Sequence, residues 1–142
     1  MRWFTRSFTR LLRRQDGAAA VEFAIVGPML VVLVLGIAGW GGFFWISHAV
    51  QQVANDAARA AIAGLDAAER QALAAQVLAD EIDDYAWLKA AAAQVSVTNE
   101  DQTVRVMVTY DASHTPFWSM KGIVPLPSST IARSATVRLG GY

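Results

Sequence analysis

The fold of this chain is decided by residues 17–46, which read GAAAVEFAIVGPMLVVLVLGIAGWGGFFWI. No charged residue occurs from Phe23 to Ile46. A helix of that length spans roughly 36 Å at ~1.5 Å per residue, enough to cross a hydrocarbon core of about 30 Å. Aromatic residues, which favour the boundary between lipid and water, gather at its far end: Trp40, Phe43, Phe44 and Trp45. We therefore predict one transmembrane helix.

Positive charge is concentrated in front of this helix. Residues 1–16 carry one aspartate and five arginines, namely Arg2, Arg6, Arg10, Arg13 and Arg14. That segment is therefore about +4 and the rest of the chain about −4. A basic tail beside a membrane helix marks the cytoplasmic side, so residues after about 47 are expected on the other face. Nucleic acid is not an expected partner, because the positive charge is confined to this tail.

Two simpler signals compete for this segment. A cleavable secretory signal has an apolar region of only ~7–15 residues, and Ala18-Ala19-Ala20 lies before the apolar core rather than after it. A plain signal anchor explains the arginines, the length and the aromatic residues. It does not explain Glu22, since a carboxylate near the start of a spanning helix is unfavourable unless it has a partner or lies at headgroup depth.

The order of features is a basic leader, Gly17, four small or aliphatic residues, Glu22-Phe23 and an apolar helix. This order resembles the class III signal of type IV pilin-like proteins, which a prepilin peptidase cuts after the glycine. Residues 17–28 resemble more narrowly the start of TadE-like pseudopilins of the tight adherence (Flp/Tad) pilus. Residues 55–61 and 130–138 are more weakly similar to later parts of that family. Gln15-Asp16 depart from the pattern, because they separate the last arginine from Gly17.

The resemblance implies a non-catalytic pseudopilin that is processed between Gly17 and Ala18 and takes part in pilus assembly. It implies a bacterial inner-membrane location with the N-terminus in the cytoplasm. The implied partners are prepilin peptidase, other pilus subunits or pseudopilins, the inner-membrane assembly platform and the lipid bilayer. Entry into the filament, capping of it and residence in the membrane stay open, as does the similar TadF-like branch. The alternative is an unprocessed membrane-anchored scaffold for pilus or secretion machinery.

Cleavage after Gly17 would remove the arginines and create an α-amino group on Ala18. Glu22 would then lie about one helical turn from a cation, and opposite charges attract strongly where the dielectric constant is low. The resemblance assigns Glu22, with Phe23 beside it, a role in subunit packing. We expect the carboxylate to pair with an N-terminal amine, its own or that of a neighbouring subunit.

Glycines and a proline mark the helix itself. Gly27-Pro28 predicts a bend, because proline lacks an N–H and clashes with the preceding turn. Small residues further along offer a face for close approach of a second helix, or are ordinary membrane-helix composition. They are Gly36, Ala38, Gly39, Gly41 and Gly42.

The remaining pattern predicts an α+β fold. The long helix continues outside the membrane to about Gly64, and Asp66 to Glu69 has the spacing of a capping box that opens a second helix, expected to reach about Ala92. That helix places apolar residues near one side: Leu73, Val77, Ile82, Tyr85 and Leu88. Alternating runs predict a small antiparallel sheet of about three strands, with a hairpin turn at residues 99–102. The strands are expected at residues 95–98, 104–110 and 130–139.

Three regions are therefore expected: a leader over residues 1–17, a transmembrane helix over 18–46 and an extracytoplasmic domain over 47–142. The prolines between residues 111 and 129 predict a loop with only short structure. Within it, Phe117-Trp118 is expected to cover the core, and is the candidate partner-binding site if it is exposed.

No catalytic or metal-binding arrangement is expected, and no cofactor. The chain has no cysteine, and its two histidines, His48 and His114, lie far apart. The acidic run over residues 80–84 lacks the spacing of a calcium loop and is interpreted as a solvated face.

Overall fold

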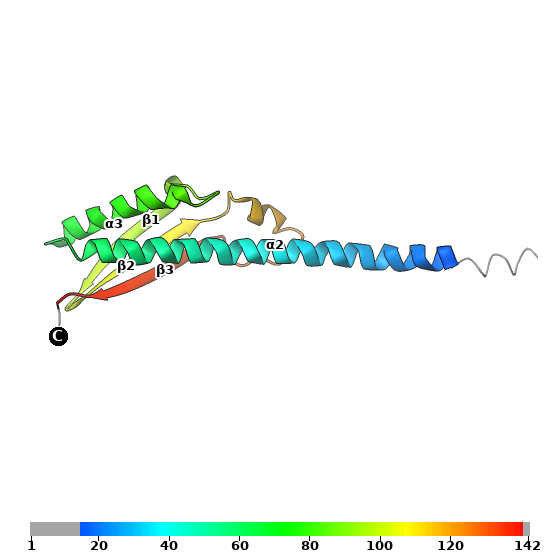
Figure 1. Ribbon diagram of the computed structural model, residues 1–142, viewed down its shortest axis with the longest axis horizontal. Coiled ribbons are helices and arrows are strands. Elements are labelled where there is room, and N and C mark those ends of the chain that lie inside the picture. Colours follow the sequence, from blue (N-terminus) through cyan, green and yellow to red (C-terminus); the bar gives the residue numbers. More distant parts are fainter. Residues whose placement is uncertain (1–14, 141–142) are drawn as a thin grey trace, which may run out of the picture.

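The structure is a computed structural model that describes residues 15–140 (Figure 1). Most of the expected leader, including all five of its arginines, lies outside the described residues. The α+β prediction is confirmed, with two long helices and a three-stranded antiparallel sheet. The helices are α2 (Gln15–Ala61) and α3 (Ala67–Glu81), and the strands are β1 (Ala93–Glu100), β2 (Thr103–Asp111) and β3 (Thr130–Arg138). Three short 3-10 helices connect them: η1 (Ile82–Asp84), η2 (Ala90–Ala92) and η3 (Pro116–Met120).

The first long helix has two halves with different surroundings. α2 is one uninterrupted helix that passes through Pro28, and its N-terminal half projects alone from the rest of the molecule (Figure 1). The C-terminal half packs on the sheet and on α3. Its buried residues recur at three- and four-residue spacing, as in an amphipathic helix: Ile46, Val50, Val53, Ala54, Ala57 and Ala61.

The sheet has the order β1-β2-β3, so β2 is central. Alternate residues of β2 are buried under the helices: Val104, Val106, Val108 and Tyr110. The residues between them, such as Arg105 and Met107, are exposed on the other face. Both helices therefore cover one face of the sheet, and the core lies between these two layers. The predicted hairpin is confirmed, with Asp101 at a positive φ of 34° in the turn.

One face of the last strand lies toward the core and includes an arginine. Ile131 is buried, and Arg133, Ala135 and Val137 are half-buried on the same side of β3. Arg133 pairs with Val108 of the central strand, so the expected alternation is correct. β3 is an edge strand, and the guanidinium Nη1 of Arg133 donates to the Ala132 carbonyl at 2.9 Å.

The capping box at the start of α3 is present. The Asp66 carboxylate accepts a hydrogen bond from the Glu69 backbone N–H at 2.8 Å. The Glu69 carboxylate reaches back to the N–H of Leu65, also at 2.8 Å. Both bonds satisfy amides that the start of a helix leaves without internal partners.

The predicted end of the second helix near Ala92 is wrong, because α3 ends at Glu81. Its last turn holds no basic residue, and acidic residues at a helix C-terminus oppose the helix dipole. Beyond η1 the chain reverses at Trp87, whose φ is +65°. The Asp83 carboxylate then accepts the Ala90 N–H at 2.8 Å, which stabilises the irregular connection to β1.

Candidate functional site

The expected processing site lies at the free end of α2. Gly17 and Ala18 are exposed in its first turns, and a Cβ added to Gly17 would meet no atom within 4 Å. Glu22 is exposed, and Phe23 is 76% exposed with its ring 3.6 Å from the position of a Cβ on Gly27. The structure therefore places the predicted processing and assembly residues together on one bare helix.

Residues 17–35, here called the anchor segment, are exposed in the described part of the chain except for the half-buried Gly27 and Leu35. Their large apolar side chains are exposed, from Val21 to Val34. α2 is long and apolar enough to cross a membrane. An isolated helix that exposes aliphatic residues on all sides needs an apolar surrounding.

Immediately after the anchor segment, the protein covers the glycine-rich face of α2 with its own chain. Residues 116–127, here called the covering loop, run along this face. Val124 lies 3.8 Å from a Cβ built on Gly36, and Leu126 lies 2.8 Å from one built on Gly39. A Cβ on Gly42 would overlap the Phe117 ring. The glycines at 36, 39 and 42 are thus covered within the chain, whereas Ala38 and Gly41 stay exposed.

Aromatic contacts fasten the covering loop to α2. Trp118 is 5% exposed and its ring centroid lies 6.2 Å from that of Phe43. Phe117 is half-buried, 5.5 Å from the ring of Trp87. The indole N–H of Trp40 donates to the Pro125 carbonyl at 3.2 Å. These positions agree with the interpretation of Phe117-Trp118 as a cover over the core, and partner binding by this pair stays a prediction.

Four exposed aromatic side chains, here called the aromatic collar, lie on or beside α2 at this level. It comprises Trp40, Phe44, Trp45 and Trp87. The Trp45 and Trp87 rings are 5.9 Å apart. The sequence pattern identified the three members on α2 but missed Trp87, because its place depends on the unexpected chain reversal after η1.

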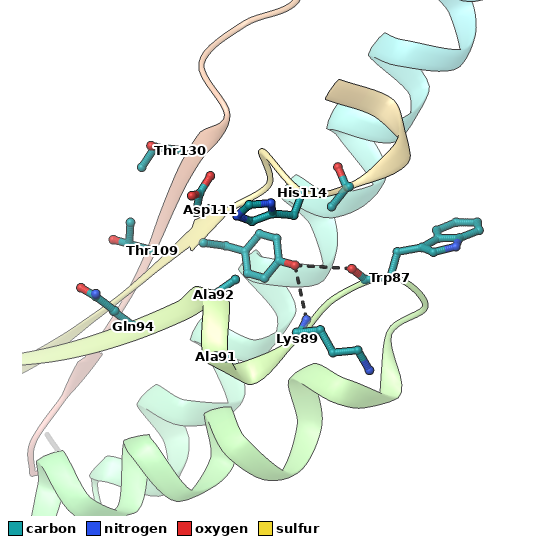
Figure 2. Close-up of a pocket in the computed structure, with 11 residues that line it drawn as sticks. Trp87, Lys89, Ala91, Ala92, Gln94, Thr109, Asp111, His114 and Thr130 are labelled. Atoms are coloured by element: carbon teal, nitrogen blue, oxygen red, sulfur yellow. Dashed lines mark hydrogen bonds between the residues drawn. The ribbon is translucent and has the colours of Figure 1, made fainter. Parts of the chain in front are cut away.

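A pocket of about 630 Å³ lies beside Trp87, between the η2 region and the ends of β2 and β3 (Figure 2). Tyr110 forms part of its wall. The Tyr110 hydroxyl accepts the Lys89 N–H at 3.3 Å and donates to the Trp87 carbonyl at 3.5 Å. Burial raises the pKa of Tyr110 above its ordinary value, although the bond from Lys89 acts in the opposite direction. This phenol holds the Trp87 turn in place and stays protonated at neutral pH.

Asp111, another polar residue of this pocket, has a structural partner of its own. The Asp111 carboxylate accepts the Ser113 N–H at 2.9 Å, and this bond is the main cause that lowers the pKa of Asp111. His114 is exposed at the rim (Figure 2). Within residues 15–140, no three His, Asp or Glu side chains gather in a way that could hold a metal ion.

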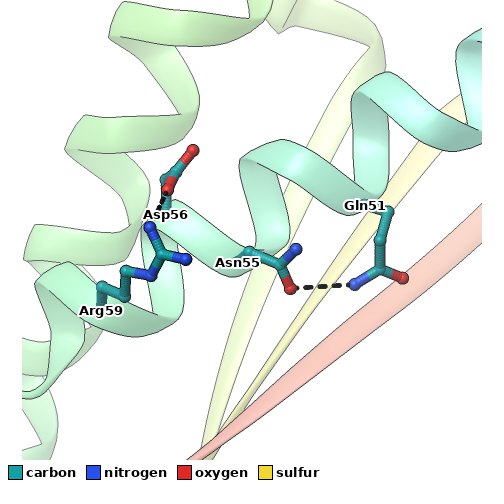
Figure 3. A network of polar contacts seen from close by, with 4 residues as sticks. All are labelled: Gln51, Asn55, Asp56 and Arg59. Carbon is teal, nitrogen blue, oxygen red and sulfur yellow. Dashed lines mark hydrogen bonds and ion pairs between the residues drawn. The ribbon is translucent and has the colours of Figure 1, made fainter.

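The polar side of the C-terminal half of α2 carries a short network (Figure 3). The Gln51 side-chain amide donates to Asn55 at 3.1 Å and to the Ser134 carbonyl of β3 at 3.2 Å. Asp56 and Arg59 form an exposed ion pair at 3.2 Å. The alanines of the same stretch, Ala57, Ala58 and Ala61, are buried and let α2 approach its neighbours closely. This explains the alternation of polar residues and alanines over residues 55–61.

Comparison with known proteins supports the interpretation of the N-terminal part. Residues 17–59 match a family model described as TadE-like protein. The match begins at Gly17 and ends in the last turn of α2. No curated protein and no solved structure matches the chain.

Proposed function

We propose that the chain is a TadE-like pseudopilin of the Tad pilus system, since residues 17–59 match the TadE-like family model. In this proposal prepilin peptidase cuts between Gly17 and Ala18, and the mature protein takes part in pilus assembly without catalysing a reaction. It is held in the bacterial inner membrane by α2, with the folded domain outside the cytoplasm.

One observation carries the proposal: the family match starts at the glycine that precedes the bare apolar helix. The peptide bond to be cut lies at the free end of α2, where no other part of the described chain covers it (Figure 1). A peptidase can therefore reach the bond without unfolding the domain.

Cleavage would create a positive charge near Glu22. This residue lies four positions after Ala18, which corresponds to ~6 Å along the helix axis. Its side chain is exposed, so no group of the folded domain neutralises it. A new amino group on Ala18, or on a neighbouring subunit, would supply the opposite charge that makes a carboxylate tolerable near lipid.

The proposal is tested by the intact mass of the protein from cells with and without prepilin peptidase. We expect the protein from cells with the peptidase to lack residues 1–17. Gly17→Val should block this cut without altering the fold, because a side chain at position 17 has open space around it. Ala20→Val, an exposed position one turn along the same helix, is the matched control and should still be cut.

The alternative is an unprocessed scaffold that recruits pilus components from the membrane. It would be supported by a full-length mass in both strains together with normal pilus output. In that case Gly17 and Glu22 would serve only the start of the anchor, and Gly17→Val would leave pilus formation unchanged.

A further inference from the structure

The covering loop extends along α2 toward the anchor segment. From Gly42 to Gly36 its contacts extend along six residues of α2, or ~9 Å of the helix axis. The end of the loop nearest the anchor is formed by Ile123 and Val124. Val124 packs on Gly36, whereas Ile123 points away and is 61% exposed.

A bilayer with Glu22 and Trp40 at its two boundaries would place this end of the loop within the lipid. Glu22 and Trp40 are separated by 18 residues, or ~27 Å along the axis, close to the hydrocarbon thickness of about 30 Å. With these two residues at opposite boundaries, Gly36 lies ~6 Å inside the outer boundary. Val124, and Ile123 beside it, would then lie at the depth of the outer acyl chains.

Several backbone groups near the tip of the loop have partners within the protein. Backbone groups in contact with lipid need partners within the protein, because no water is present to supply them. The N–H groups of Ile123 and Val124 both donate to the Met120 carbonyl at 2.9 Å. Pro125 and Pro127 have no N–H, and the Pro125 carbonyl accepts the indole of Trp40.

The side chains around the loop are arranged as they are at a lipid–water boundary. From Trp40 to Trp45 the aromatic collar covers ~7.5 Å of the axis, similar to a headgroup layer of about 5–8 Å. Exposed amphipathic rings favour this layer. The two lysines of the chain, Lys89 and Lys121, lie two positions from Trp87 and Ile123 in sequence, where their charges can reach lipid phosphates.

We propose that the covering loop and the aromatic collar lie in the outer leaflet of the bilayer. The helix α2 and the covering loop then both anchor the protein in the membrane. The lipid surface is the occupant because Ile123 is exposed and apolar, and its neighbour Val124 packs on Gly36, the residue that directly follows the exposed apolar anchor segment. The proposal rests on the membrane anchoring in the proposed function. It places the outer edge of the hydrocarbon core near Trp40, ahead of the residue-46 boundary expected from the sequence.

The absence of cysteine from the sequence permits a direct test. Single-cysteine variants of the full chain would be labelled with the fluorophore NBD and reconstituted in vesicles of phosphatidylcholine and phosphatidylglycerol. Ile123→Cys reports on the loop and Leu33→Cys on the anchor segment. Met107→Cys, exposed on the outer face of the sheet, is the control outside the membrane. Near-UV circular dichroism would check that each variant is folded.

We expect lipids with nitroxide-labelled acyl chains to quench position 123 to a similar extent as position 33, and to leave position 107 unchanged. Quenching at position 33 without quenching at position 123 overturns the seating of the loop and leaves the anchoring intact. A label at position 123 that is shielded from aqueous iodide but not quenched by lipid indicates a protein partner and also overturns it. No quenching at position 33 contradicts the anchoring itself.

Discussion

At the scale of single residues, two adjacent glycines of α2 differ in the space available for a side chain. A Cβ on Gly42 would overlap the Phe117 ring, whereas a Cβ on Gly41 meets nothing within 4 Å. Gly42→Ala should therefore displace the covering loop and lower the free energy of unfolding by about 1–3 kcal/mol, as overpacking does. Gly41→Ala should raise it by about 0.5–1 kcal/mol, because alanine favours the helix. Thermal unfolding of the full chain in detergent, followed by near-UV circular dichroism, measures both.

The two substitutions differ only in the direction in which the new methyl group points. Equal effects of Gly41→Ala and Gly42→Ala would show that the covering loop does not pack on α2. A loss at Gly42 that is restored by also shortening Phe117, in the double variant Gly42→Ala with Phe117→Leu, would assign the effect to this contact.

Glu22 allows a second prediction at this scale. Its proposed charge pairing requires an ionised carboxylate, so Glu22→Gln should reduce pilus output as strongly as Glu22→Ala, although glutamine keeps the size and polarity. Glu22→Asp should retain part of the output, because it keeps the charge. Quantifying surface pili and the processed fraction for all three variants tests this, and unchanged output from Glu22→Ala would rule out the pairing.

At the scale of elements, the patterns that predicted correctly were local ones. The capping box at Asp66 and the hairpin near Asp101 depend on a few neighbouring residues, and both are present. The end of α3 was missed because apolar spacing continues past it: Ile82 and Leu88 are buried as expected, but from a 3-10 turn and an irregular segment. The signal that could have located this end is the acidic run itself, which opposes the helix dipole with no basic residue near it.

The acidic end of α3 gives a prediction about pH. Burial, and then repulsion from Asp56, Asp84 and Asp80, raises the pKa of Glu81 above its ordinary value of 4.5. The ionised group therefore destabilises the folded state at pH 7, and this penalty disappears as the pH falls through the raised pKa toward 4.5. Glu81→Gln should stabilise the protein by about 0.3–1 kcal/mol at pH 7 and have little effect below about pH 4.5.

Thermal unfolding of the full chain in detergent between pH 4 and pH 8 measures this difference. The control is Asp80→Asn. Asp80 directly precedes Glu81 and is exposed, so this substitution should change the pH dependence of stability less than Glu81→Gln does. A stabilisation by Glu81→Gln that is the same at all these pH values would exclude its ionisation as the cause.

At the scale of the whole molecule, the sequence predicted an anchor followed by a domain but not how they join. The indole of Trp40 and the carbonyl of Pro125 are 85 residues apart in the chain, and no local pattern brings them together. The glycines at 36, 39 and 42 indicated a close approach to α2, and only the structure shows that the approaching segment is the chain's own loop. The contacts of the folded domain therefore extend along α2 to about Gly36, within the helix that also forms the anchor.

This joint predicts how the domain behaves when it is separated from the anchor. A fragment of residues 47–142 lacks Ile46, which is fully buried, and the α2 surface on which Phe117, Val124 and Leu126 lie. Loss of one large buried aliphatic residue alone costs about 2–5 kcal/mol, so we expect this fragment to be unfolded or without a fixed environment for Trp118. A fragment of residues 36–142 keeps every contact of the covering loop with α2 named above and should retain the near-UV circular dichroism of the full chain in a mild detergent. Equal folding of both fragments would place the joint at residue 46, and loss of structure in both would show that the anchor segment itself stabilises the domain.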